Sequence, residues 1–157
     1  MRIRPLEPAD LPEIVDITTE AFAGAGVDYW IEQRWGRLGS TGWQDRKAVH
    51  AVADATAADG RVLVAEAGDG AVVGYVSMRL HPEARLGWIP NLAVRADHRG
   101  RGLGRRLLEE ALASLKEAGM HWAKIETLAV NERGQSLYPS VGFQEVVRQI
   151  HYIKPLV

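Results

Sequence analysis

The segment Val94–Leu112, "VRADHRGRGLGRRLLEEAL", constrains the fold more strongly than any other part of the chain. It follows an apolar stretch, passes through three glycines, and ends in a leucine-rich pattern typical of an amphipathic helix. Five arginines lie in the twelve residues from Arg95 to Arg106. Arginines at the start of a helix oppose its dipole, by about 0.3–1 kcal/mol each at exposed sites. The segment therefore predicts a strand, a glycine loop and a helix whose N-terminus faces a negatively charged group.

The loop Arg99–Gly104 has the composition of a phosphate-binding turn. Glycines let the backbone approach a ligand closely, and a helix N-terminus adds free N–H donors. Arginines beside such donors favour a di- or polyphosphate. The Rossmann motif does not fit, because Arg105 and Leu107 stand where its last glycine would be, and the Gly-Lys-Ser/Thr ending of a P-loop is absent. The alternative interpretation is a tight strand-to-helix turn with a solvated basic surface.

The rest of the chain predicts one α/β (α+β) domain over residues 1–157, with helices packed on a mixed sheet. Strands are expected within residues 1–8, 61–68, 71–82, 84–94, 121–130 and 142–154, and helices within 9–24, 28–36, 43–58, 103–118 and 131–138. Pro90 lies inside the strand at 84–94, and proline has no N–H to donate to a ladder. We therefore expect that strand to be bulged or splayed there.

Composition excludes several classes of function. The formal net charge is −1, whereas a nucleic-acid-binding domain is usually basic. The chain has no cysteine, which removes disulfides, thiolate metal sites and a cysteine nucleophile. No His/Asp/Glu cluster has metal-ligand spacing, so no metal is expected. No apolar run approaches the length of a membrane span, no targeting segment is evident, and a cytoplasmic location is expected.

The glycine loop resembles motif A of the GCN5-related N-acetyltransferases, the GNAT superfamily. Its signature, [Arg/Gln]-x-x-Gly-x-[Gly/Ala], falls on Arg99, Gly102 and Gly104. A second stretch, "IETLAVNERGQSLYPSVGF", resembles the family's next motif, with Asn131 and Tyr138 seven residues apart. The opening "IRPLEPADLPEI" is also similar to the family's usual start. The resemblance covers most of the chain except residues 24–58.

The resemblance implies a mixed, mostly antiparallel central sheet with a V-shaped splay, flanked by helices. Acetyl-CoA, as a co-substrate, would bind between the strands at 84–94 and 121–130. Main-chain groups of Leu92 and Val94 would pair with its pantetheine arm, and Asn131 would bond to the same arm. The pyrophosphate would lie on the backbone of seven consecutive residues: Arg99, Gly100, Arg101, Gly102, Leu103, Gly104 and Arg105.

Two residues are candidates for catalysis. In the family, a tyrosine at the position of Tyr138 gives a proton to the departing thiolate, and a phenol with a pKa of about 10 is protonated at neutral pH. Pro139 follows directly and predicts that the helix ends at Tyr138. Glu126 matches a position at which some members carry the general base, and its alternative role is that of a surface strand glutamate. Asn91 occupies another common base position and could only order a water molecule.

The sequence thus predicts an N-acetyltransferase that moves the acetyl group of acetyl-CoA to a primary amine by direct attack in a ternary complex. A catalytically silent acyl-CoA-binding or sensing domain remains an alternative. A nucleic-acid-binding loop is disfavoured by the net charge and by Glu109 and Glu110 after the arginines. The acceptor, a small molecule or a protein amine, stays open, as does a homodimer. The last strand is expected to be continuous, hairpinned or exchanged with a neighbour, and the sequence does not decide between these. Trp30, Trp35 and Trp43 are expected in the core and the wall of the acceptor side.

Overall fold

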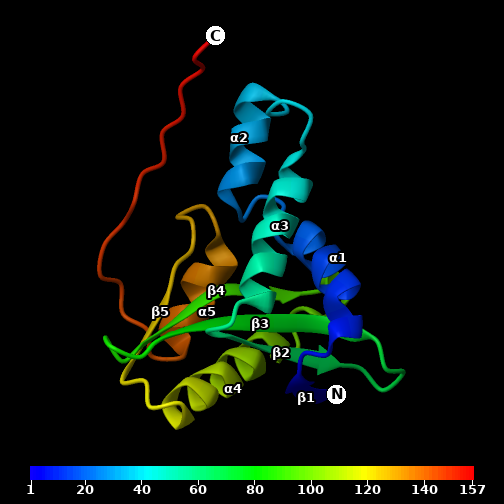
Figure 1. Ribbon diagram of the computed structural model, residues 1–157, viewed down its shortest axis with the longest axis vertical. Helices are drawn as coiled ribbons and strands as arrows, with labels where there is room; N and C mark the ends of the chain where they lie inside the picture. The colour runs from blue at the N-terminus through cyan, green and yellow to red at the C-terminus, as the bar shows by residue number, and fades with distance from the viewer.

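The computed structural model describes residues 1–157 and is built on a five-stranded sheet with the order β1-β2-β3-β4-β5 (Figure 1). The strands are β1 (Arg2–Pro5), β2 (Gly60–Glu66), β3 (Val72–His81), β4 (Leu86–Val94) and β5 (Trp122–Ile125). The first four pair antiparallel, and β5 pairs parallel to β4. This is the mixed, mostly antiparallel sheet that the sequence predicts.

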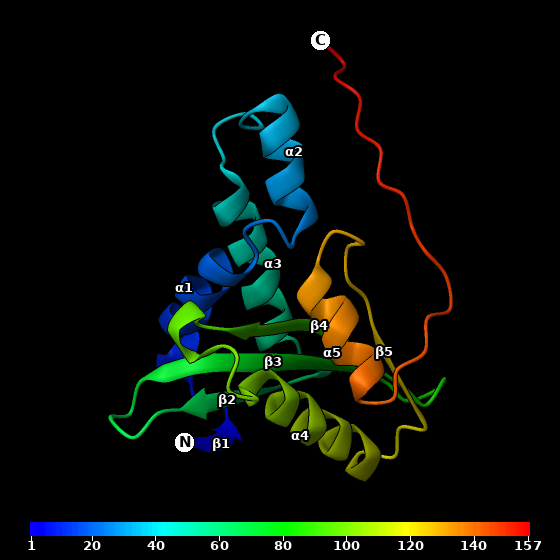
Figure 2. The ribbon, with the colours of Figure 1, turned by 180° about the vertical axis from the view of Figure 1, so that it is seen from behind.

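Helices cover both faces of the sheet (Figures 1 and 2). They are α1 (Leu11–Ala21), α2 (Val27–Trp35), α3 (Trp43–Thr56), α4 (Leu103–Glu117) and α5 (Glu132–Ser140), with short 3-10 turns η1 (Pro8–Asp10) and η2 (Ala96–His98). α1 and α3 pack on one face and α4 on the other, while α5 follows β5. No helix combines the length and the apolar character needed to cross a membrane.

Two apolar clusters hold the layers together. Twelve buried residues fill the space between the sheet and α4, and seven fill the space between the sheet and α1. The run Val72–Met78 of β3 is buried throughout because this strand lies between both helical layers. The leucines of α4 follow the helical spacing seen in the sequence, and each buried leucine stabilises the fold by about 1.5–3 kcal/mol.

The sheet opens at Pro90. On β3, Ser77 and Arg79 are separated by one residue, whereas their partners Asn91 and Trp88 on β4 are separated by two. This extra residue makes a bulge, which bends a strand and interrupts its pairing. The ladder between β4 and β5 reaches only Ile89, opposite Ile125. The expected distortion at Pro90 is confirmed, and beyond it β4 and the chain after β5 diverge as a V.

Two predictions of secondary structure are wrong, one for the end of α5 and one for the last strand. α5 continues through Pro139 to Ser140, because a proline in the last turn removes only one helical hydrogen bond. The strand expected over residues 142–154 is not formed: the chain after Phe143 is neither helix nor strand. A strand needs neighbouring N–H and C=O groups, and no backbone within this chain supplies them to that segment.

Candidate functional site

A cleft of about 1230 Å³ occupies the opening of the V. Its walls come from the end of α1, the second half of β4, the N-terminus of α4, the chain after β5, and α5. The predicted residues that line it are Leu92, Val94, Arg99, Gly100, Gly102, Leu103, Gly104, Arg105, Glu126, Asn131 and Tyr138. Of the predicted site residues, Arg101 alone is outside the lining.

β4 turns unpaired backbone toward the cleft. The N–H of Arg95 donates to the carbonyl of Val73 at 2.9 Å, so these two form a hydrogen-bonded pair. Hydrogen-bonded and non-hydrogen-bonded pairs alternate along an antiparallel ladder. The pairs Gly74↔Val94 and Val76↔Leu92 are therefore non-bonded, and the N–H and C=O groups of Leu92 and Val94 point away from β3. They face the side that β5 has left. The Val94 carbonyl accepts a hydrogen bond from Arg99 there, so the Val94 N–H and both backbone groups of Leu92 stay open to an extended ligand.

The start of α4 supplies a group of free donors. The first N–H used by the helix is that of Arg106, which donates to Gly102 at 3.1 Å. The N–H groups of Leu103, Gly104 and Arg105 donate no hydrogen bond, as expected at a helix N-terminus. Gly102 precedes them with φ of +78°, a conformation that side-chain-bearing residues rarely adopt. This arrangement fits an anion.

Arg99 adds a half-buried positive charge to these donors. Its Nε donates to the Val94 carbonyl at 2.7 Å, which fixes the guanidinium against β4. Its Nη2 atom is buried without a hydrogen-bond partner and lies 4.0 Å from the nearest oxygen of Glu20. Burial, followed by the charge of Arg133, lowers the pKa of Arg99 from its ordinary value. A buried donor without a partner favours the binding of an acceptor such as a phosphate oxygen.

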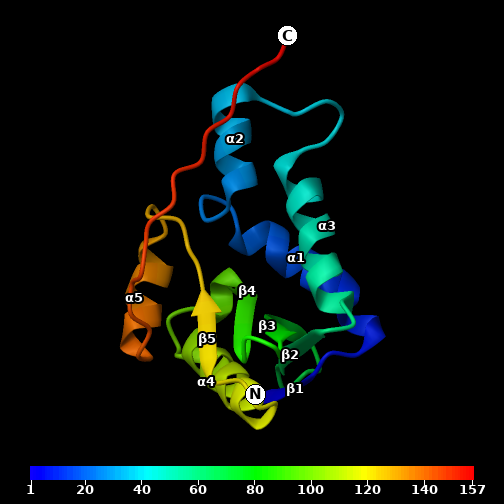
Figure 3. The same ribbon diagram turned by 60° about the vertical axis from the view of Figure 1, so that its left-hand side comes forward.

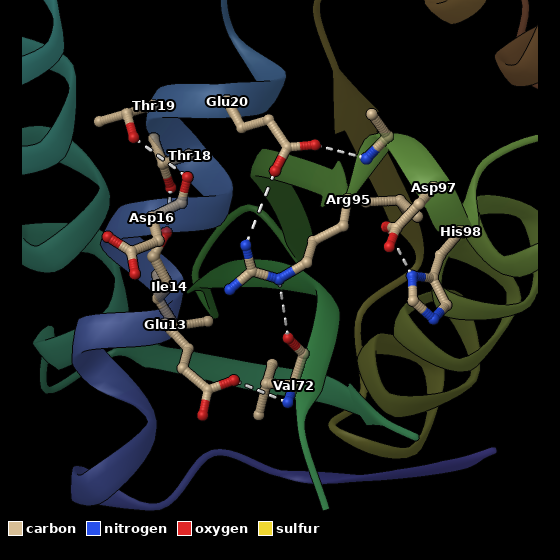
Figure 4. Close-up of polar contacts among 12 residues, drawn as sticks. Glu13, Ile14, Asp16, Thr18, Thr19, Glu20, Val72, Arg95, Asp97 and His98 are labelled. Atoms are coloured by element: carbon tan, nitrogen blue, oxygen red, sulfur yellow. Dashed lines mark hydrogen bonds and ion pairs between the residues drawn. The ribbon is translucent and has the colours of Figure 1, made fainter. Parts of the chain in front are cut away.

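Two carboxylates of α1 hold the loop in place (Figure 4). Glu20 accepts a hydrogen bond from the N–H of Ala96 and lies 3.6 Å from Arg95. Arg95 also donates from Nε to the Val72 carbonyl at 3.3 Å, and the N–H of Val72 donates to Glu13 at 2.7 Å. The turn that leads into the glycine loop is therefore fixed to both α1 and β3.

Asn131 and Gly134 join α5 to the chain after β5. The Oδ1 of Asn131 accepts a hydrogen bond from the Gly134 N–H at 3.4 Å and caps the helix, while its Nδ2 donates to Thr127 at 2.8 Å. A Cβ on Gly134 would lie only 2.8 Å from the hydroxyl oxygen of Thr127, so this close approach requires glycine. On the opposite wall, Arg105 donates to the carbonyl and hydroxyl of Ser140 at 3.1 and 2.7 Å.

Tyr138 lies in the wall of the cleft, on α5. Its ring meets that of Phe143 edge-on, with centroids 6.2 Å apart. Its hydroxyl has no hydrogen-bond partner within the chain, and burial raises the pKa of this phenol to about 12. Tyr138 is therefore a protonated donor over the physiological range.

Glu126 also reaches the cleft, just beyond the end of β5. Its side chain is 60% exposed, and its nearest charged neighbour is Lys124, whose Nζ lies 3.7 Å from Oε2.

Asn91 has a different role from the one expected. It is buried outside the cleft lining, and its amide donates to Asp54 at 3.0 Å and to Ser77 at 2.9 Å. Its Oδ1 accepts from Lys47 Nζ at 2.7 Å, and that ammonium lies 4.0 Å from the ring centroid of Phe22. Burial lowers the pKa of Lys47. Asn91 is thus committed to protein partners, and the sequence spacing from Lys47 and Asp54 on α3 gave no signal of this network.

The expectation for the three tryptophans is confirmed only for Trp43, which lies in the core. Trp43 is buried, but Trp30 and Trp35 are 45% and 44% exposed, and none of the three lines the cleft. Trp30 instead fixes the turn before α2 by donating to the Gly24 carbonyl at 3.0 Å.

Comparisons with known proteins agree with this geometry. Residues 58–145 match the family model described as an acetyltransferase (GNAT) domain. A mycothiol acetyltransferase of Beutenbergia cavernae is 34% identical over 57% of this chain and 30% of its own length. An aminoglycoside N(6')-acetyltransferase type 1 of Stenotrophomonas maltophilia is 25% identical over 78% of this chain and 86% of its own. The matched region thus spans less than a third of the first relative.

The fold has a solved counterpart. The PaiA N-acetyltransferase of Thermoplasma acidophilum, in complex with coenzyme A, superposes with a TM-score of 0.68 at 23% identity, over 91% of this chain and 89% of that one. The family match covers more than half of the chain, including the glycine loop, both strands of the V and α5. The chain belongs to the GNAT acetyltransferase family.

Proposed function

We propose that residues 1–157 form one N-acetyltransferase domain that transfers the acetyl group of acetyl-CoA to a primary amine. The observation that carries the proposal is the convergence of unused donors on one cleft. Three helix N-terminal N–H groups, a buried guanidinium atom without a partner and the open edge of β4 all face it. Together they match a pyrophosphate followed by an extended, amide-containing arm, which is the chemistry of coenzyme A.

The residues of the opposite wall fit the reaction. The amine nitrogen forms a bond to the acetyl carbon, and the carbon–sulfur bond breaks. Tyr138 donates its proton to the departing thiolate, since burial keeps its phenol neutral. Glu126 takes the proton that the attacking amine loses, directly or through one water molecule. Both groups line the same cleft, so amine and thioester can be held together there.

The acceptor class follows from the reaction and from the relatives. A primary amine carries the lone pair that attacks a thioester, and the aminoglycoside acetyltransferase is named for a transfer to nitrogen. Over the matched regions, this chain is only 34% and 25% identical to the two relatives. The acceptor of neither relative is therefore assigned to this chain. We infer an amine of a small molecule or of a polypeptide.

The proposal is tested by mixing the protein and acetyl-CoA with each of a panel of amines and measuring the release of free CoA. Because the chain has no cysteine, a thiol reagent in this assay reports only on CoA. Release that depends on one class of amine supports the transferase. Tight binding of acetyl-CoA without release for any amine would instead support the acyl-CoA-binding or sensing domain. Failure to bind acetyl-CoA would overturn both.

A further inference from the structure

A polar network lies between the sheet and α3, on the face of the sheet that α1 and α3 cover (Figure 3). Its centre is Asn91 on β4, which is only 1% exposed. The amide of Asn91 donates to Ser77 on β3 at 2.9 Å and to Asp54 on α3 at 3.0 Å, and its Oδ1 accepts from Lys47 on α3 at 2.7 Å. The network therefore joins one helix to two neighbouring strands.

The network spans the bulge that opens the sheet. Ser77 and Asn91 form the last regular pair of β3 and β4 on one side of the bulge. Arg79 and Trp88 form the first pair on its other side. One carboxylate oxygen of Asp54 accepts from Asn91, and the other accepts from Arg79 at 3.2 Å. Both strands are thus held to α3 at the point where their own pairing is interrupted.

Lys47 joins this network to a wall of the cleft. Its ammonium donates to Asn91 and also lies 4.0 Å from the ring centroid of Phe22. Phe22 directly follows α1 and lines the cleft. Leu92, which follows Asn91 on β4, lines the cleft as well. One cation therefore holds the end of α1 against the strand whose backbone edge faces the cleft.

The position of Lys47 is unfavourable for a charged group. Its hydrogen-bond acceptor is a neutral amide, and the carboxylates of Asp54 and Asp28 act on the ammonium only through space. Burial lowers the pKa of Lys47, and it outweighs the attraction of these two carboxylates. Because a cation loses hydration there without a close ion pair, its presence is better explained by the geometry that it imposes than by stability.

We propose that Lys47 is a positioning residue that fixes the end of α1 relative to β4 and thereby aligns the open backbone groups of Leu92 and Val94 with the pantetheine arm. This inference rests on the acetyl-CoA site of the proposed function. The glycine loop is held elsewhere, since Glu20 of α1 accepts a hydrogen bond from the Ala96 N–H before it. Lys47 therefore acts on the binding of the arm and not on that of the pyrophosphate.

Two ligands separate these effects. Lys47→Met keeps a long unbranched side chain and removes its charge. The Kd for acetyl-CoA, measured by calorimetry, should rise roughly 10-fold, because one or two hydrogen bonds to the arm are misaligned. The Kd for ADP, which carries a pyrophosphate but no pantetheine arm, should stay unchanged in the same variant.

Asn91→Ala provides a second variant, because it removes the group that Lys47 binds on β4. It should weaken acetyl-CoA binding by a similar factor and leave ADP binding unchanged. The double variant should bind acetyl-CoA no more weakly than Asn91→Ala alone, as expected for two residues that act through one contact.

Asp10→Asn distinguishes positioning from a general loss of stability. It removes a buried carboxylate at the start of α1 that is no part of the cleft lining, so Tm should fall while the Kd for acetyl-CoA stays the same. NMR of the 15N-labelled proteins without ligand gives an independent readout. In Lys47→Met the amide signals of Leu92 and Val94 should shift, whereas those of Gly104 and Arg105 should not.

The outcomes separate this inference from the proposed function. A parent protein that does not bind acetyl-CoA would overturn both. If the parent binds it, the inference alone is overturned by Lys47→Met and Asn91→Ala proteins that bind acetyl-CoA as tightly as the parent, or that lose affinity for ADP by the same factor. An equal loss of acetyl-CoA affinity in Asp10→Asn would likewise show that Lys47 contributes only to stability.

Discussion

At the scale of single residues, burial determines which group of the cleft can give a proton. Tyr138 has no hydrogen-bond partner for its hydroxyl, and its raised pKa of about 12 comes from desolvation. Since burial disfavours the charged phenolate, the phenol of Tyr138 stays protonated at neutral pH. Glu126 lines the same cleft and is 60% exposed. The roles that we propose for them therefore pair a buried proton donor with an exposed proton acceptor.

Replacing Tyr138 by phenylalanine removes the proton donor and nothing else of the wall. We expect kcat to fall by roughly 10²–10⁴-fold, with acetyl-CoA affinity unchanged, as measured by steady-state kinetics and calorimetry. Tyr152→Phe removes the same hydroxyl from a tyrosine that is 90% exposed in the segment after α5, and should leave kcat intact. Tyr138 would leave the mechanism if its variant were as fast as the parent with chemistry rate-limiting.

Glu126→Gln tests the proton acceptor. The amide keeps the size of the side chain but cannot take a proton, so the acidic limb of the pH–rate profile should disappear and the maximal rate should fall. Glu110→Gln, on the exposed face of α4, is the matched control and should leave the profile unchanged. If the limb persists in Glu126→Gln at full rate, the titrating group is the acceptor amine or another residue.

At the scale of elements, the loop before α4 is the donor-binding element that we propose. Gly102→Val places a branched side chain beside the free N–H groups and strains a residue with φ of +78°. Acetyl-CoA at 100 times its Kd should stabilise the folded parent protein by about 2.7 kcal/mol and so raise its Tm. The increase in Tm should be largely lost in Gly102→Val. Gly70→Val carries similar strain, at φ of +90° in a hairpin turn, and should keep the shift. A full shift in folded Gly102→Val would exclude the loop as the binding element.

The junction of β1 and α1 carries a stability term that depends on pH. Two hydrogen bonds from Arg4, at 2.7 and 3.0 Å, lower the pKa of Asp10, and the N–H of Glu7 adds to this effect. The carboxylate thus contributes stability that is complete above its ordinary pKa of about 4 and lost as pH falls through its lower folded value.

Asp10→Asn should lower the free energy of unfolding at pH 7 by about 1–3 kcal/mol and flatten its fall below pH 4. Chemical denaturation at several pH values measures both effects. Asp16→Asn, at an exposed position of α1, is the control. Equal acid sensitivity in Asp10→Asn and the parent would show that the pair does not set the pH dependence.

The same junction shows which elements the sequence could predict. Asp10 and Glu13 lie at the start of α1, where Asp10 accepts a hydrogen bond from Arg4 and Glu13 accepts one from the N–H of Val72. The helix was still found, because its apolar spacing is local, whereas the partners of its carboxylates come from strands that lie distant in sequence. The bulge at Pro90 could also be predicted from local sequence, because proline lacks the N–H that any β-ladder would use, whatever strand lies beside it.

The residues that line the cleft could be predicted from the sequence, whereas the buried network behind them could not. Arg99, Gly102, Asn131 and Tyr138 lie in two short motifs, and the resemblance of these motifs to the GNAT family was enough to predict that they share one site. The Lys47–Asn91–Asp54 network joins α3 to β4 and depends on the approach of two layers, which no spacing reveals. The expected strand at 142–154 is a similar case, because alternation along the sequence indicates a strand but does not show whether any backbone is in place to pair with it.

At the scale of the whole molecule, the transfer that we propose requires one cleft to hold both substrates, and this would set the order of the reaction. A covalent acetyl-enzyme would need a nucleophile with an adjacent base. The chain has no cysteine, and the serines that line the cleft are Ser136 and Ser140. No histidine lines it, and the Ser140 hydroxyl is already bonded to the Leu137 carbonyl and to Arg105. Direct attack of the amine on the thioester is therefore the route that this cleft supports.

Initial rates measured against acetyl-CoA at several fixed acceptor concentrations should give lines that intersect, because both substrates must be bound before either product leaves. Intact-mass spectrometry of the protein mixed with acetyl-CoA alone should show no added acetyl group. Proximity in the ternary complex then supplies much of the rate. A substitution in either wall of the cleft should therefore lower the rate of the single transfer step that consumes both substrates. Parallel lines, together with an acetylated protein that forms and decays as fast as turnover, would instead require a nucleophile, with Ser136 as the first serine of the cleft to replace.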